Sequence, residues 1–238
     1  GRPKDVIVDG HGKILQPDGY GELKPTDNVL KTVPDAQGRP KDVIVDGHGK
    51  ILQPDANGVI KPTDKKIVQV PVGNGKSKDL IVDGQGKIQQ PDDKGGFTPD
   101  PKQTNNKVVE IAQPDGKKTP VIVSKDNHVQ QPDANGVIKP TDKKIVQVPV
   151  GSGKSKDLVV DGQGKIQQPD DKGGFTPDPK QTDKTVVQIK GPNGQDAPVV
   201  VNKDNHVQQP DGQGGFKSTD NVLKKVPDAQ GKTHDLIV

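Results

Sequence analysis

The sequence KDVIVDGHGKILQPD occupies Lys4–Asp18 and returns unchanged at Lys41–Asp55. It holds two short runs, VIV and KIL, on either side of the Gly-bearing segment DGHG. β-Branched side chains suit pleated strands, and a Gly-containing turn between two such runs is typical of a hairpin. The pattern predicts a strand at Val6–Val8, a turn, and a second strand at Lys13–Leu15. The Pro of QPD should stop the second strand, because Pro has no N–H to donate to a ladder.

This element belongs to a longer repeat that fills the chain. Lengths of 37 and 41 residues alternate from the second repeat onward, which gives a period of 78 residues. Asp55–Thr104 recurs as Asp133–Thr182 with two substitutions, which indicates recent duplication within a longer parent array. The predicted repeats span residues 4–40, 41–77, 78–118, 119–155, 156–196 and 197–233, and residues 234–238 (HDLIV) match the first strand of a seventh.

The composition predicts an all-β chain without one deep core. Apolar residues make up 27% of the 238 residues, less than is usual for a globular domain. They are mostly Val and Ile, which favour strands. Glu occurs only at positions 22 and 110 and Ala is scarce, so helices are close to excluded. The 29 Gly and 23 Pro fall between short apolar runs, as expected of strands joined by tight turns.

The remainder of each repeat predicts a second turn and a last strand. The last strand, such as Val29–Val33 or Ile67–Val72, alternates in part, so one face should contact water. Pro71 and Pro149 inside such strands indicate sheet edges. After the second turn comes one large apolar residue, which we expect to fill the small core of its repeat: Leu23, Ile60, Phe97, Ile138, Phe175 and Phe216.

The charge pattern indicates a solvated surface. The 35 Lys and Arg nearly balance the 32 Asp and Glu, which leaves a net charge of +3. Lys alternates with Asp along the chain, so we expect no strong electrostatic field. Three Phe and one Tyr supply too few stacking platforms for bases, and nucleic acid is therefore not an expected partner.

Two absences bear on compartment and anchoring. Cysteine is absent, which excludes disulfides, thiolate metal ligands and thiol nucleophiles. In this the chain resembles many exported proteins of Gram-positive bacteria. No hydrophobic stretch approaches the roughly 20 residues that span a bilayer, and no signal peptide opens the chain. We expect no membrane span in this segment, and the targeting segment of an exported protein to lie outside it.

A phosphate-binding loop is the most conspicuous motif to weigh. GNGKS at Gly73–Ser77 and GSGKS at Gly151–Ser155 resemble the end of such a loop. The full motif needs a Gly where this chain has Val70 and Val148, and a strand follows in place of a helix. We therefore interpret both segments as Lys-bearing turns.

Each of four histidines occupies a position that holds a different polar residue in sister repeats. His11 and His48 occupy a turn position that holds Gln in sister repeats, and His128 and His206 take the place of a Lys. Residues exchanged so freely within one chain predict a surface role. They do not predict a metal ligand or a catalytic base.

Calcium is the one cofactor that the sequence leaves open. DANG at Asp55–Gly58 and Asp133–Gly136, and SKDN at Ser124–Asn127, place two side-chain oxygens close together, and Ca²⁺ prefers oxygen ligands. No repeat carries a complete calcium-loop series, and Asp and Asn also favour turns through bonds to their own backbone. We expect no cofactor, with structural calcium as the alternative.

Catalysis has little support in the sequence. A nucleophile needs a neighbouring base in a dry pocket, yet the five Ser lie in Lys-rich turns and the paired carboxylates recur as near copies. We expect no enzyme activity and no catalytic, cofactor-binding or metal-binding residues.

Repeats of this size allow three architectures. An elongated tandem array of β-hairpins needs only contacts between neighbours, so a low apolar content suffices. A closed six-bladed propeller is the alternative, because VIVDGHGKI resembles the core of an NHL-type blade and Asn106–Lys117 resembles the strand that closes one. In a closed ring, however, HDLIV would compete with KDVIV at Lys4–Val8 for one position. The array is therefore favoured over the propeller, and a continuous β-solenoid is the third arrangement.

The chain as a whole is similar to the repeat regions of bacterial cell-surface adhesins and biofilm proteins. The similarity lies in near-identical duplicated repeats, the absence of Cys, the few aromatics and the abundance of Lys, Asp, Gly, Pro and Val. It implies an extracellular, non-catalytic spacer or stalk on the bacterial surface, whose partners are other parts of the same long protein, with self-association a second expectation.

The alternative function is a binding module for a protein or polysaccharide. In that case Phe97, Phe175, Phe216 or Tyr20 should gather on one exposed face. A spacer should show no such concentration.

Overall fold

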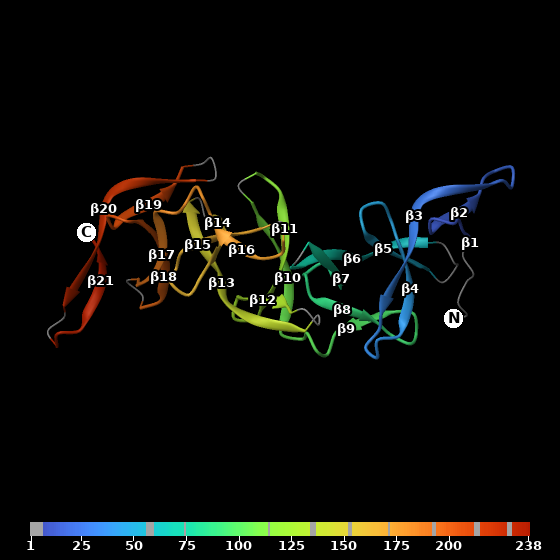
Figure 1. Cartoon of the computed structure of the whole chain (residues 1–238), viewed down its shortest axis with the longest axis horizontal. Coiled ribbons are helices and arrows are strands. Elements are labelled where there is room, and N and C mark those ends of the chain that lie inside the picture. The colour runs from blue at the N-terminus through green and yellow to red at the C-terminus, as the bar shows by residue number, and fades with distance from the viewer. Residues whose placement is uncertain are drawn as a thin grey trace. The chain divides into compact units, whose positions relative to one another are not determined.

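The computed structural model describes residues 7–55, 60–73, 75–113, 115–133, 137–151, 154–170, 172–191, 194–211, 215–227 and 230–238. The regular structure in these residues is all β (Figure 1). The chain divides into two compact parts. The first body comprises Gly1–Val70 with Ser77–Val109, and the second body comprises Pro71–Lys76 with Glu110–Val238.

Every sheet is antiparallel, and its strands lie side by side in chain order (Figure 1). The first sheet contains β1 (Ile7–Val8), β2 (Lys13–Pro17), β3 (Leu23–Pro34), β4 (Pro40–Val45), β5 (Lys50–Pro54), β6 (Ile60–Gly73), β7 (Lys76–Val82), β8 (Ile88–Pro91) and β9 (Phe97–Pro99).

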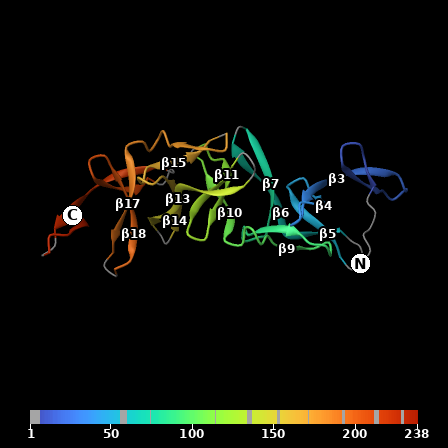
Figure 2. The same ribbon diagram turned by 60° about the horizontal axis from the view of Figure 1, so that its bottom comes forward.

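The second and third sheets continue the same plan, for example in the β17–β18 hairpin (Figure 2). The second contains β10 (Asn106–Ala112), β11 (Lys118–Ser124), β12 (His128–Pro132), β13 (Ile138–Gly151), β14 (Lys154–Val160), β15 (Ile166–Pro169) and β16 (Phe175–Pro177). The third contains β17 (Lys184–Lys190), β18 (Asp196–Asn202), β19 (His206–Pro210), β20 (Phe216–Pro227) and β21 (Thr233–Ile237).

This topology confirms a tandem array of hairpins. β1 is an edge strand of the first sheet, paired with β2, and β21 is an edge strand of the third sheet, paired with β20. The sheets hold nine, seven and five strands and do not follow a blade-by-blade division. In the described part of the chain, therefore, no propeller closes.

Repeat length decides where a sheet ends. In a 37-residue repeat one long strand pairs first with the strand before it and then with the strand after it, and Val29 of β3 pairs with both Lys13 and Val45. In the 41-residue repeats this strand is split, as β9 and β10 or as β16 and β17. Lys87 still bridges Lys107, so the four extra residues loop out and leave the register intact.

Prolines lie within several of these strands. β2 runs through Pro17, which pairs with Leu23, so the second strand ends later than we predicted. Pro149 pairs with Ser155 in the half of β13 that has β14 as its hydrogen-bonded neighbour, while β12 pairs with the other half. A Pro is tolerated there, because its missing N–H faces no second strand.

Aspartate builds the first turn of most repeats. Asp46 Oδ1 accepts hydrogen bonds from the backbone N–H groups of His48 (2.9 Å) and Lys50 (2.8 Å), and Gly49 completes the turn with φ +79°. Asn202 takes the place of this Asp in the last full repeat and accepts the same two bonds, while Asn205 adopts a φ of +63°. The abundant Asp thus serves the backbone, as Asx-turn residues do.

These backbone bonds depress several carboxyl pKa values. Hydrogen bonds from the backbone of Lys13 and then His11 lower the pKa of Asp9, and the backbone bond from Lys50 has the largest effect in lowering that of Asp46. The backbone bond from Lys117 does the same for Asp115. A group whose pKa is lower in the folded state stabilises the fold above its unfolded pKa, and this stabilisation is lost as pH falls through the folded pKa.

We therefore expect the melting temperature to be flat near neutral pH and to fall below about pH 4, where carboxyl groups take up protons. A triple Asp→Asn variant at positions 9, 46 and 115 should fold and show a shallower acid decrease, because Asn keeps the acceptor without the titration. The matched control carries Asp→Asn at positions 27, 126 and 220, whose side chains accept no such backbone bond. Equal acid profiles for the two variants, measured by circular dichroism, would contradict the assignment.

The most buried positions of the core differ from the ones we predicted. Leu23 is 47% exposed, and the five other predicted plug residues are half-buried. The buried position lies in the second strand of each repeat, where exposure is at most 9%, at Ile14, Ile51, Ile88, Val129, Ile166 and Val207. Their side chains point into the packed face of the sheet, whereas the predicted residues stand at the start of the following strand.

Two clusters of buried residues, one in each body, include Ile51 and Ile166 from this set. Ile51 and Ile67 of the first body pack with four other buried residues, and Phe97 lies against that cluster. In the second body Val160 and Ile166 pack with five others, and Phe216 lies against them. The fold thus has separate small cores, as a low apolar content requires.

Candidate functional site

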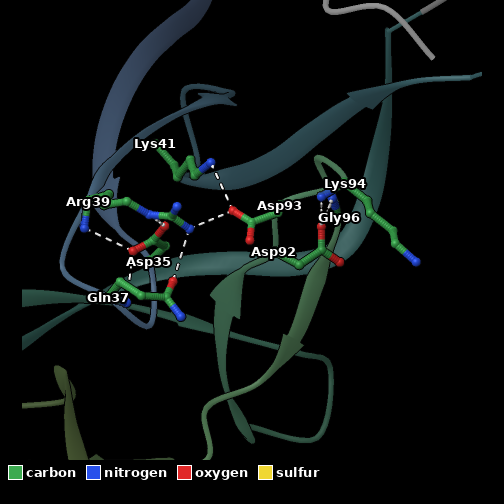
Figure 3. Close-up of polar contacts among 8 residues, drawn as sticks. All are labelled: Asp35, Gln37, Arg39, Lys41, Asp92, Asp93, Lys94 and Gly96. Atoms are coloured by element: carbon green, nitrogen blue, oxygen red, sulfur yellow. Dashed lines mark hydrogen bonds and ion pairs between the residues drawn. The ribbon is translucent and has the colours of Figure 1, made fainter.

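A charged cluster in the first body joins residues that are distant in sequence (Figure 3). Arg39, in the β3–β4 turn, places Nε 2.7 Å from Asp35 Oδ2 and Nη2 2.6 Å from Asp93 Oδ1. Lys41 Nζ lies 3.4 Å from the same Asp93 oxygen. Asp93 is positioned by the β8–β9 turn, in which Asp92 Oδ1 accepts bonds from two backbone N–H groups.

The electrostatics of this cluster favour a structural clamp. Burial of Asp35 acts to raise its pKa, but hydrogen bonds from the Arg39 backbone and guanidinium outweigh burial, and the pKa lies below its usual value. The side-chain bond to Asp35 in turn raises the pKa of Arg39. Asp35, Arg39, Lys41 and Asp93 each have an oppositely charged partner, so the ion pairs link the β3–β4 turn to the β8–β9 turn.

A second type of contact recurs with the 78-residue period. Gln53 Nε2 donates to Gly95 O at 2.7 Å, and Gln131 Nε2 donates to Gly173 O at 2.7 Å. Each bond ties the second strand of one repeat to the second turn of the next. Because these residues are 42 positions apart, neighbouring repeats are linked side by side.

The second body also contains a cavity of about 590 Å³. Lys156, Lys180 and Lys184 contribute positive charge to its walls, and Asp157, Asp178 and Asp211 contribute negative charge. Its apolar walls include Ile111, Leu158, Ile166 and Phe216.

Gln181 lines this cavity and is unusual in its hydrogen bonding. It is 7% exposed, and its Oε1 is a buried polar side-chain atom without a hydrogen-bond partner. In the matching position of the earlier period, Gln103 Oε1 accepts a bond from Asn106 Nδ2 at 2.8 Å. Lys184 stands where Asn106 would be, and its Nζ binds Asp183 Oδ1 instead. Sequence reasoning missed Gln181, although the change from Asn106 to Lys184 between near-identical copies was a visible signal.

The structure shows where the histidines and the GNGKS segment lie. His11, His48 and His128 are exposed, and His206 Nδ1 lies 3.2 Å from Thr219 O. Within GNGKS, Gly75 lies in a turn with φ +70° and β7 follows, whereas Asn74 and part of the twin segment lie outside the described residues.

The oxygen-rich turns proposed for calcium are only partly described. Asp55 and Asp133 pair with lysines, each at 2.8 Å, while the remainder of both DANG segments lies outside the described residues. In the SKDN turn, Ser124 Oγ accepts from His128 N at 3.2 Å. Among the described residues no group of three or more His, Cys, Asp or Glu is placed to hold a metal ion. They also include no helix that is long and apolar enough to cross a membrane.

Comparisons with protein-family models, with curated proteins and with solved structures found no match to this chain.

Proposed function

We propose that this chain is a non-catalytic spacer of an extracellular bacterial surface or biofilm protein. The observation that carries the proposal is the consecutive strand order within each of the three sheets, where every strand pairs with its neighbours along the chain. A chain built in this way gains length by adding repeats without redesigning a central core. Its adjoining repeats in the parent protein are its first expected partners.

The distribution of aromatic residues supports a spacer over a general binding surface. Phe97 and Phe216 each pack against their own apolar cluster, and Phe175 is half-buried at the start of β16. Tyr20 is 94% exposed but lies alone in the β2–β3 turn. An exposed group of aromatic anchors, as interfaces commonly use, is not formed by these four residues.

Small-angle scattering on variants of different repeat number tests the proposal. Deleting Lys78–Ser155 removes one period and joins Ser77 to Lys156, which recreates the natural Ser155–Lys156 junction. Inserting a second copy of Lys78–Ser155 after Ser155 adds one period. A spacer should lose and gain the same increment of maximum dimension, with circular dichroism unchanged per residue.

The radius of gyration of the unmodified 238-residue chain provides a result that would refute the proposal. A compact 238-residue domain has a radius of gyration of about 18 Å. A value near that figure, with little change between the shorter and longer variants, would show that the repeats fold back into a globule and would refute the spacer function.

A further inference from the structure

We propose that the cavity of the second body binds a neutral, hydroxyl-rich ligand, a saccharide unit, and that Gln181 is its principal hydrogen-bond acceptor. The proposal goes beyond the spacer function and does not depend on it. A repeat array that only holds other domains apart needs no such site, and a site in one period gives that period a property that its near copy lacks.

The size and walls of the cavity fit a small ligand. Its volume of about 590 Å³ falls within the range of roughly 300–1,000 Å³ that is typical of small-molecule sites. β14 and β15 supply Leu158 and Ile166, which are 6% and 3% exposed, and Phe216 at the start of β20 supplies a half-buried ring whose centroid lies 5.5 Å from Lys156 Nζ. These groups offer apolar contact to the C–H surface of a sugar beside polar groups for its hydroxyls.

The unpartnered oxygen of Gln181 specifies the kind of group that is missing. An amide oxygen accepts hydrogen bonds, so a ligand must present a donor to it. A buried acceptor without a donor has lost its hydrogen bonds to water and gained none in the protein, and such groups are rare in folded proteins. Oε1 is enclosed in this structure, so a ligand in the cavity reaches it only when the amide rotates about χ3, which is a broad torsion in Gln.

The charges on the walls favour a neutral ligand over an ion. Three Lys and three Asp line the cavity, so an anion would meet carboxylates and a cation would meet ammonium groups. A hydroxyl group both donates and accepts. It can therefore donate to Gln181 or to an Asp and accept from a Lys or from Gln168, and a ligand with several hydroxyls uses this mixture of groups best.

The earlier period shows the same Gln with a paired oxygen and offers a control. There Asn106 Nδ2 satisfies Gln103 Oε1. The two sequences are identical from Asp83 to Thr104 and from Asp161 to Thr182, and they diverge immediately afterwards. Lys184, 9% exposed, has replaced the donor and bonds to Asp183. The substitution Lys184→Asn should therefore supply a side-chain donor to Gln181 Oε1, as Asn106 does for Gln103.

Saturation-transfer NMR and isothermal titration calorimetry on the full chain test the proposal. The probes are glucose, galactose, N-acetylglucosamine and maltose, with glucuronate and glucosamine as charged analogues. We expect one or more of the neutral sugars to bind and the charged analogues to bind more weakly. Gln181→Leu and Lys184→Asn should each weaken binding about tenfold or more, because each removes the open acceptor. Gln103→Leu, at a site whose oxygen is already paired, should leave binding unchanged.

The melting temperature of the ligand-free protein gives a second test, which applies even if one variant is unstable. Lys184→Asn should raise the melting temperature of the free protein, because it supplies the donor that Gln181 lacks, while Gln181→Leu is checked for folding by circular dichroism. The proposal is overturned if no neutral sugar binds, or if both variants bind as the unmodified protein does. It is also overturned if a crystal soaked with the sugars shows only a water molecule on Gln181.

Discussion

Replacing Ile51 with Ala is expected to lower the free energy of unfolding of the first body by about 2–5 kcal/mol, as measured by urea denaturation. Ile51 is fully buried, at 0% exposure, and belongs to the cluster that includes Val45, Ile67 and Ile81. Removing its side-chain atoms leaves a cavity that hydrogen-bonded strands on both sides prevent from collapsing. A change of this size is a large part of the total stability of a small domain.

The loss of stability caused by Ile51→Ala should be confined to the first body. Hydrogen exchange measured by mass spectrometry should accelerate in the described residues of the first body and stay unchanged in the β17–β21 sheet, because separate clusters stabilise separate parts of an array. Ile7→Ala makes the same chemical change at a residue that is 53% exposed, and should have little effect. Uniform acceleration along the whole chain would show that the two clusters unfold together.

Replacing Gly86 with Ala is expected to destabilise the first body by about 2–5 kcal/mol. Gly86 has a φ of +79°, and a Cβ added there would lie well inside van der Waals contact of Val108 O. The left-handed conformation costs an Ala about 1–2 kcal/mol, and overpacking adds about 1–3 kcal/mol. The clash also strains the 2.8 Å bond from Val108 N to Gly86 O, which restores the register after the four-residue insertion.

Gly95 provides a matched control for this substitution. Its φ is also +79°, but a Cβ there would meet nothing within 4 Å. Gly95→Ala should therefore show the conformational cost alone, about 1–2 kcal/mol. Faster exchange of the Val108 amide should accompany Gly86→Ala and be absent from Gly95→Ala. Equal losses of stability in the two variants would mean that the close approach of the strands contributes nothing.

Local features of the fold could be predicted well from the sequence. The hairpin of KDVIVDGHGKIL and the all-β class follow from β-branched runs and Gly-bearing turns, whose effects act over a few residues. The interchange of His11 with Gln correctly placed it at an exposed turn. The most buried residue of each repeat was predicted wrongly, because Leu23 and its counterparts were chosen as the one large apolar residue after the second turn, although Phe97 and Phe216 do pack against the clusters. Burial depends instead on which face of the strand meets the rest of the sheet, and that face belongs to Ile14.

The candidate site was the least predictable feature. Arg39 and Asp93 lie 54 positions apart, and no local pattern indicates that their turns meet. Gln181 and Gln103 have the same sequence before them and differ in their hydrogen bonds because of one later residue, Lys184 in place of Asn106. The substitution can be seen in the sequence, but its effect on the hydrogen bond of the Gln side chain is seen only in the structure.

The sequence by itself determined the strands, the turns and their repetition, because Asp, Gly, Pro and β-branched residues bias the backbone within a few positions of themselves. The tertiary structure alone decided which Ile or Val is enclosed and which distant turns meet, as those of Arg39 and Asp93 do. Those outcomes depend on atoms from repeats some 40 or more residues apart, and contact between them exists only once the strands have paired.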